Sequence, residues 1–287
     1  TRNIQFSQNR NSLIISSHKS PARSNFVVMK AIAPFSLFSI LLACCFLSCE
    51  DNATSPRTLV LDLDYFPLSI GQTKYFEVDS VVLRPVIGGT FYDSIQFEVR
   101  ETLVDTFSGP DGQVWYRGER WERVGEQAPW QFRQTFTQTV MEQAAFRSED
   151  NLTFTKLVFP VRSGRQWDGH TAFDEFRQLI IGGEFLDVYA GWEYRITDVD
   201  ETYELNDQTT LDSIIRIEQA EVDNLIDFRL AYERYARGLG LVERFVDARH
   251  TQCQVCCNGD TGSCLDLSWD NKAEKGFILH ERLIRVE

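Results

Sequence analysis

The densest group of reactive side chains lies in the segment HTQCQVCCNGDTGSC, which begins at His250 and holds four of the seven cysteines. Cys253 and Cys256 have the Cys-x-x-Cys spacing of a zinc ligand pair, which His250, Cys257 or Cys264 could complete. In an oxidising compartment the same four thiols would instead form disulfides. The compartment in which the chain folds therefore decides between the two chemistries.

A second group, WDGHTAFDE, places Asp168, His170, Asp174 and Glu175 close together. An imidazole beside carboxylates can act as a general base, so Asp168, His170 and Glu175 are candidates for an envelope-polymer hydrolase. The same mixture is typical of a solvated turn after a strand, and we favour that interpretation. The motifs H-E-x-x-H, G-x-S-x-G, G-x-x-x-x-G-K-[ST] and G-x-G-x-x-G do not occur. We therefore expect a non-enzymatic protein, with the hydrolase as the alternative.

Aromatic side chains could line a groove for a small apolar or glycan ligand, because flat rings offer a large apolar area with a polar tip. The candidates are Trp115, Tyr116, Trp121, Trp130 and Trp192. Aromatic residues in strands are more often part of the core, which is the competing interpretation. No cofactor and no metal are expected.

The beginning of the chain has the layout of an export signal. Residues 1–28 mix Ser, Asn, Arg and Gln without a sustained apolar period, and we expect them to be an over-extended, non-native N-terminus before Met29. In residues 29–48 a lysine follows the methionine and an apolar run extends to Leu47, as in a secretory signal peptide. The run is too short for a transmembrane helix, which needs about 20 apolar residues.

The end of this signal, FLSC, resembles a bacterial lipoprotein signal, in which a small residue precedes the lipidated cysteine. The resemblance implies lipidation of Cys49, with residues 49–60 as a polar tether, although Phe46 replaces the usual leucine. LLAC, which ends at Cys44, is the rival site. The acidic pair after Cys49 also resembles the export signals of Bacteroidota surface lipoproteins. These resemblances imply an outer-membrane lipoprotein, on either the periplasmic or the outer face.

The charge balance limits the partners. The chain has 29 basic and 42 acidic residues, a net charge of −13, and no acidic residue precedes Cys49. Such a surface repels phosphate backbones, so nucleic acid is excluded as a partner. The acyl chains of a lipoprotein would hold it on the membrane. We expect a lipid-anchored cell-envelope protein that binds a partner protein, a lipid or a small apolar or glycan ligand.

Residues 61–287 consist of short runs with a period of two, separated by turn signals. In QFRQTFTQTV, Phe132, Phe136 and Val140 alternate with polar residues, and KYFEVDSVV and SIQFEVRE show the same pattern. Sequential strands of this kind predict an antiparallel all-β domain. We expect a curved sheet or half-open barrel, with a β-sandwich as the alternative, preceded by a signal-peptide helix.

Two segments echo each other. FPLSIGQTKY begins at Phe66 and FPVRSGRQW at Phe159, and each has a glycine four residues after its proline. This composition is typical of the entrance to a β-meander, so the pair predicts two similar half-sheets. A later segment, YERYARGLGLVERF, is similar to a strand near the C-terminus of many uncharacterised Bacteroidota lipoproteins. Together the motifs resemble a family of curved sheets like those of LolA and related periplasmic lipid carriers, which implies a shape but no catalytic residues.

Export also bears on the cysteine segment, which we expect to be an elaborated hairpin loop over residues 250–264. In an oxidising compartment four cysteines give two disulfides. A bond between the neighbours Cys256 and Cys257 would be strained, which leaves two pairings. They are Cys253–Cys256 with Cys257–Cys264, or Cys253–Cys257 with Cys256–Cys264. Such bonds would stabilise the loop by about 2–3 kcal/mol, and zinc remains the alternative.

Overall fold

The computed structural model describes residues 62–109, 112–206 and 209–287. The predictions for the N-terminus, the signal peptide and the tether, including those for Cys49 and Cys44, fall outside the described residues. In the part that is described, no helix has the length and apolar character needed to cross a membrane.

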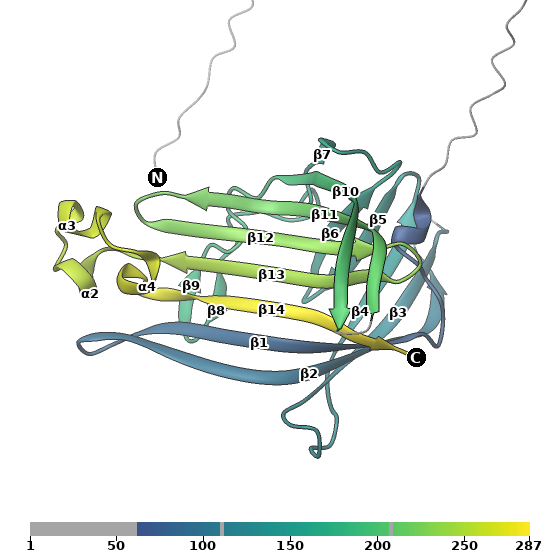
Figure 1. Ribbon diagram of the computed structural model, residues 1–287, viewed down its shortest axis with the longest axis horizontal. Coiled ribbons are helices and arrows are strands. Elements are labelled where there is room, and N and C mark those ends of the chain that lie inside the picture. Colours follow the sequence, from purple (N-terminus) through teal and green to yellow (C-terminus); the bar gives the residue numbers. More distant parts are fainter. Residues whose placement is uncertain (1–61, 110–111, 207–208) are drawn as a thin grey trace, which may run out of the picture. The chain divides into compact units, whose positions relative to one another are not determined.

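Twelve strands form one antiparallel sheet, in the order β6-β5-β4-β3-β2-β1-β14-β13-β12-β11-β10-β7 (Figure 1). The strands are β1 (Thr73–Val86), β2 (Gly89–Ser108), β3 (Val114–Arg123), β4 (Gln131–Met141), β5 (Ala144–Glu149), β6 (Leu152–Val158), β7 (Gln166–Trp167), β10 (Tyr194–Asn206), β11 (Thr209–Asp223), β12 (Asp227–Ala236), β13 (Gly240–His250) and β14 (Lys275–Val286). A separate hairpin pairs β8 (Leu179–Ile181) with β9 (Glu184–Leu186), and the 3-10 turn η2 (Leu63–Tyr65) precedes β1.

The sheet curves until its two edge strands approach each other. The Thr155 amide of β6 donates to the Gly169 carbonyl at 3.0 Å, and the Trp167 indole of β7 donates to the Thr155 carbonyl at 2.8 Å. These bonds leave the sheet as a nearly closed barrel. The prediction of an all-β half-open barrel is confirmed, and the alternative of a β-sandwich, which needs two packed sheets, does not apply.

The two echoing segments occupy equivalent places at the start of each half of the sheet. The first leads into the meander β1–β6 and the second into β7 and then β10–β14, and β1 pairs with β14 to join the halves. Phe66 and Phe159 are both buried. Gly71 and Gly164 both have a positive φ and donate their amides to a strand carbonyl, at 2.8 and 2.7 Å. The shared turn chemistry therefore directs the chain into each half in the same way.

The predicted alternation of β4 is interrupted by one extra residue. Phe136 is buried, but Phe132 is 52% exposed, because the pairing with β3 shifts between Gln134 and Phe132. A bulge of this kind moves every side chain beyond it to the opposite face of the sheet. Phe132 therefore packs edge-on against Trp121, with ring centroids 5.4 Å apart, instead of joining Phe136.

The inside of the barrel is filled by two apolar clusters. The larger includes Tyr194, Tyr235 and Phe159, and the smaller surrounds Phe76 and Leu283.

Candidate functional site

Charged side chains from seven strands meet inside the barrel and form one buried ion network. Its members are four carboxylates and four cations: Glu101, Glu149, Glu233, Glu281, Arg120, Arg147, Lys156 and Arg244. Several pairs join strands that are far apart in the sheet order, such as Lys156 of β6 with Glu233 of β12. The network therefore spans the interior, where the charges are stable only because they compensate one another.

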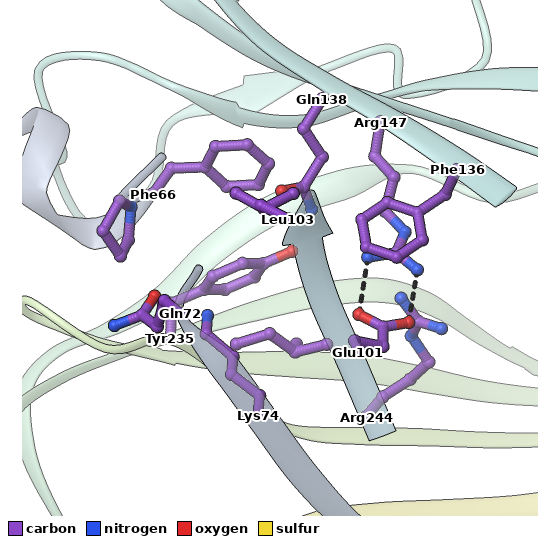
Figure 2. A pocket seen from close by; sticks show the side chains of 13 residues that line it. Phe66, Gln72, Lys74, Glu101, Leu103, Phe136, Gln138, Arg147, Tyr235 and Arg244 are labelled. Atoms are coloured by element: carbon purple, nitrogen blue, oxygen red, sulfur yellow. Dashed lines mark hydrogen bonds and ion pairs between the residues drawn. The ribbon is translucent and has the colours of Figure 1, made fainter. Parts of the chain in front are cut away.

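Glu101 forms the centre of one half of the network. Its two oxygens accept from the Arg147 guanidinium at 2.9 and 2.6 Å, as Figure 2 shows. Arg120 donates to Glu101 at 2.9 Å and to Glu281 at 3.1 Å. Burial would raise the pKa of Glu101, but the charges of Arg147 and Arg120 outweigh burial and lower it to about 2.

Glu233 forms the centre of the other half. It accepts from Lys156 at 2.7 Å, from Arg244 at 2.8 Å and from the Tyr235 hydroxyl at 2.6 Å. Burial opposes its ionised form, but Lys156 and Arg244 lower the pKa of Glu233 to about 2. Burial lowers the pKa of Lys156, although Glu233 opposes that shift.

Arg244 lines three small cavities. One of about 40 Å³ is lined by Phe66, Lys74, Tyr235 and Gly240 (Figure 2). Two more, of about 180 and 250 Å³, share Glu149, Phe154, Tyr189, Arg244 and Leu279 in their walls. These two adjoining cavities have room for more than single water molecules.

The 180 Å³ cavity contains donors that have no acceptor within the described protein. Trp192 and Gln219 both line it, and both are buried. Neither the Trp192 Nε1 nor the Gln219 Nε2 has a hydrogen-bond partner. A buried donor without an acceptor is costly, and such groups are rare in native proteins. The rest of the wall combines apolar side chains, such as Val188, Val246 and Phe277, with paired charges of the ion network, such as Glu233. This arrangement suits an uncharged molecule that has both an apolar part and acceptor atoms.

The ion network could have been found in the sequence. Glu101 lies between Val99 and Leu103 on the apolar face of its strand, where the alternation calls for an apolar side chain. The same anomaly occurs at Lys156, Arg244 and Glu281, whose neighbours two positions away are apolar. A charge in the middle of an apolar face predicts a buried, paired group.

The structure places His170 in an aromatic cluster. Its imidazole lies 4.9 to 5.8 Å, between ring centroids, from Phe154, Phe173, Tyr189, Trp192 and Tyr194. Its Nε2 meets the Tyr194 hydroxyl at 3.3 Å. Burial lowers the pKa of His170 to about 4, although Asp168 opposes the shift, so the ring is neutral at physiological pH.

The neighbouring carboxylates stabilise the loop. Asp168 accepts the backbone amide of His170 at 2.7 Å, and Glu175 accepts that of Gly191 at 3.1 Å. Asp168, His170, Asp174 and Glu175 do line one open hollow of about 730 Å³, so the structure brings the four together. The hydrogen bonds of Asp168 and Glu175 nevertheless go to backbone amides, as expected for a folded turn.

The five aromatic candidates lie in different places. Trp192 lines the 180 Å³ cavity and the hollow beside His170. Trp121 and Trp130 instead stack on the Arg100 guanidinium, 5.2 and 5.0 Å from it. Trp115 and Tyr116 are half-buried on β3. Trp192 is therefore the candidate that the structure brings to the interior cavities.

The cysteine segment lies in the loop of the hairpin that β13 forms with β14. The loop between β13 and β14 contains three short helices, α2 (Gln254–Cys257), α3 (Thr261–Leu265) and α4 (Trp269–Lys272). The Glu274 carboxylate accepts three backbone amides at the start of α2, at 2.6 to 2.9 Å. This carboxylate fixes the loop beside β14.

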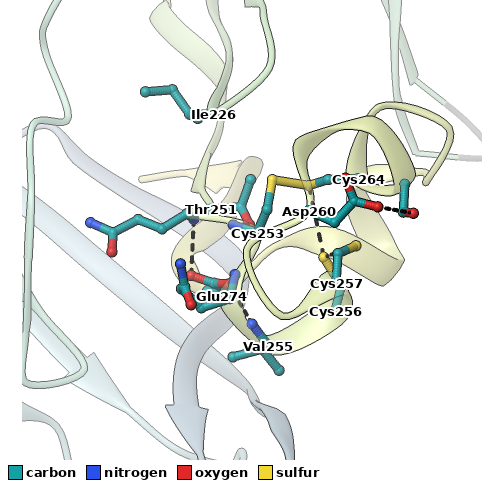
Figure 3. The surroundings of a disulfide bond; sticks show 12 residues. Ile226, Thr251, Cys253, Val255, Cys256, Cys257, Asp260, Cys264 and Glu274 are labelled. Carbon is teal, nitrogen blue, oxygen red and sulfur yellow. Dashed lines mark hydrogen bonds between the residues drawn. A yellow bond between two sulfur atoms is a disulfide. The ribbon is translucent and has the colours of Figure 1, made fainter.

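Neither expected disulfide pairing occurs. A disulfide joins Cys253 to Cys264, and Cys256 and Cys257 are free thiols (Figure 3). The prediction of two bonds among all four cysteines in either pairing is therefore wrong for this structure. The reason is that Cys253 precedes α2 in a left-handed conformation, and contacts between α2 and α3 bring its Cα within 5.8 Å of that of Cys264. No local pattern in the segment predicts these short helices.

Two of three comparisons with known proteins found no match. No protein-family model matches the chain, and no curated protein matches it. Among solved structures, a match is found to the "Crystal structure of a putative lipoprotein from Parabacteroides distasonis ATCC 8503", with 10% sequence identity and a TM-score of 0.30. The match covers 78% of this chain and 98% of the other. Similarity at this level carries no argument about function, and the resemblance to LolA stays a prediction.

Proposed function

We propose that this chain is a lipid-anchored, non-enzymatic protein of the cell envelope whose barrel binds a small ligand in its interior. The cavity beside Arg244, with its two unpaired donors on Trp192 and Gln219, carries the proposal. The signal that ends at Cys49 supports the anchor and the location.

The chemistry of the wall limits the ligand. The ion network balances four carboxylates with four cations, so a full charge on the ligand would lack a counterion. The free donors of Trp192 and Gln219 match uncharged acceptors such as carbonyl or sugar oxygens. The adjoining cavities are each smaller than the range of about 300–1,000 Å³ that is usual for drug-sized ligands. A short acyl ester or amide and a single glycan unit share this chemistry.

Native mass spectrometry of the protein purified from its host membranes tests the proposal. We expect a bound small molecule in the wild-type protein and a reduced bound fraction in Trp192→Phe, which keeps a ring but removes the donor. Loss of one hydrogen bond worth about 1 kcal/mol corresponds to roughly fivefold weaker binding. The ligand mass distinguishes an acyl compound from a glycan.

A matched control is available on β3. Trp115 also has a buried Nε1 without a partner, but it does not line the two adjoining cavities. Trp115→Phe should leave the bound fraction unchanged. Equal losses in both variants, or wild-type protein that carries no small molecule, would contradict the proposal.

The anchor is tested separately. Cys49→Ala should abolish acyl labelling and release the protein from the membrane fraction, because the acyl chains supply the attachment. Cys44→Ala should remain labelled and membrane-bound. Labelling that depends on Cys44 instead would move the anchor to the rival site.

A further inference from the structure

The four sulfurs of the cysteine loop form one cluster with two different environments. Cys253 and Cys264 are buried, and a disulfide joins them (Figure 3). Cys256 and Cys257 are half-buried, so reagents can reach them. Their Sγ atoms lie 2.7 Å apart, and the Cys256 Sγ lies 3.8 Å from that of Cys264.

We propose that Cys256 and Cys257 form a redox site: a vicinal disulfide that opens and closes while the buried Cys253–Cys264 bond stays intact. The proposal does not depend on a ligand in the barrel. It replaces the expectation that strain excludes a bond between these neighbours.

The contacts of the loop favour closure of this pair. The two sulfurs are nearer than two unbonded heavy atoms in optimal contact, which lie about 3.5–4.0 Å apart. The other two cysteines already bond each other, so Cys256 and Cys257 have no further cysteine partner in the described chain. Glu274 and the buried disulfide both fix the start of α2, the helix that carries the two thiols.

The same geometry makes the bond easy to reduce. Adjacent Cα atoms lie about 3.8 Å apart across a trans peptide, which is shorter than the usual span of about 4.4–6.8 Å for a disulfide. The Cα atoms of Cys253 and Cys264 lie 5.8 Å apart, within that span. Strained and exposed disulfides are the labile ones. The outer bond should therefore open at a less reducing potential than the inner bond.

The oxidant is the disulfide of a partner thiol oxidoreductase. Burial, reinforced by Cys257, raises the pKa of the Cys256 thiol to about 11. The Cys257 thiolate bonds to one partner sulfur and breaks the partner disulfide. Cys256 then loses its proton, attacks the Cys257 sulfur and displaces the partner. The pair loses two electrons and two protons, and the partner leaves as a dithiol.

Peptide mapping of the full-length protein tests this proposal. Protein from the host is acid-quenched, denatured without reductant, alkylated and cut with trypsin. Cleavage after Arg249 and Lys272 gives one peptide, residues 250–272, with all four cysteines. We expect it to carry no alkyl group after oxidised-glutathione treatment. In glutathione buffers of increasing reducing strength, two alkyl groups should appear first, at Cys256 and Cys257.

Cys257→Ser is the matched control. It should show one alkylated thiol, at Cys256, while the Cys253–Cys264 bond remains. Alkylation of both Cys256 and Cys257 in glutathione-oxidised wild-type protein would overturn the proposal. A Cys256–Cys264 bond would overturn it as well, as would four reactive thiols that hold zinc.

Discussion

Removal of the Glu233 charge should strongly destabilise the barrel, because it leaves a buried cation unpaired. Glu233 is 1% exposed and accepts hydrogen bonds from Lys156, Arg244 and Tyr235. In Glu233→Gln the Lys156 ammonium loses its counterion, whereas Arg244 keeps Glu149 at 3.8 Å and Glu281 at 3.6 Å. Breaking a buried pair by removing one partner costs about 3–5 kcal/mol. That is a large fraction of a typical unfolding free energy of about 5–15 kcal/mol.

The pKa of Glu233 gives an independent magnitude. Lys156 and Arg244 lower it from 4.5 to about 2. This difference corresponds to about 3 kcal/mol in favour of the folded state. Because the folded pKa is depressed, the contribution is complete above pH 4.5 and disappears as the pH falls toward 2. The stability difference between wild-type and Glu233→Gln should therefore shrink over that interval.

Urea unfolding at pH 7 and at lower pH measures both effects. Asp105→Asn is the control, because Asp105 pairs with Arg117 at 2.7 Å on the surface and is 52% exposed. An exposed pair contributes about 0–1 kcal/mol. The double variant Glu233→Met with Lys156→Met should recover part of the loss, since no unpaired charge remains on Lys156. Equal small losses in Glu233→Gln and Asp105→Asn would refute the role assigned to the network.

Two further predictions concern basic groups whose pKa is lowered in the folded protein. Burial lowers the pKa of Lys74 from 10.5 to about 8, although Glu101 opposes the shift. The unfolded state therefore binds the Lys74 proton more tightly than the folded state, and the unfolding free energy rises between pH 8 and 10.5. Lys74→Met should raise the unfolding free energy at pH 7 by about 1–3 kcal/mol and should remove its rise between pH 8 and 10.5. A Lys74→Met variant that is less stable than wild-type by the same amount at pH 7 and pH 10 would contradict this prediction. The pKa of His170, lowered by burial to about 4, predicts ring NMR signals that do not titrate between pH 5.5 and 8; a midpoint near 6.5 would show that the ring is solvated.

Much of the fold could be predicted because the relevant information is local. The period-two pattern of Phe97 and Val99 identifies β2 and its buried face. The two echoing segments, which begin at Phe66 and Phe159, identify the start of each half of the sheet. Phe132 shows where this reasoning ends. One extra residue in β4 turns its side chain outward, and only the pairing with β3 reveals the shift.

The sequence by itself determined the strand content, the acidic charge and the cysteine cluster, because composition and alternation are properties of neighbouring residues. The tertiary structure decided which charges pair and which sulfurs bond. Lys156 and Glu233 are 77 positions apart, and only closure of the barrel brings them to 2.7 Å. Cys253 and Cys264 meet because α2 and α3 contact each other, and this contact leaves Cys256 and Cys257 side by side. The wall of the candidate cavity likewise depends on long-range contacts, which a local pattern cannot specify.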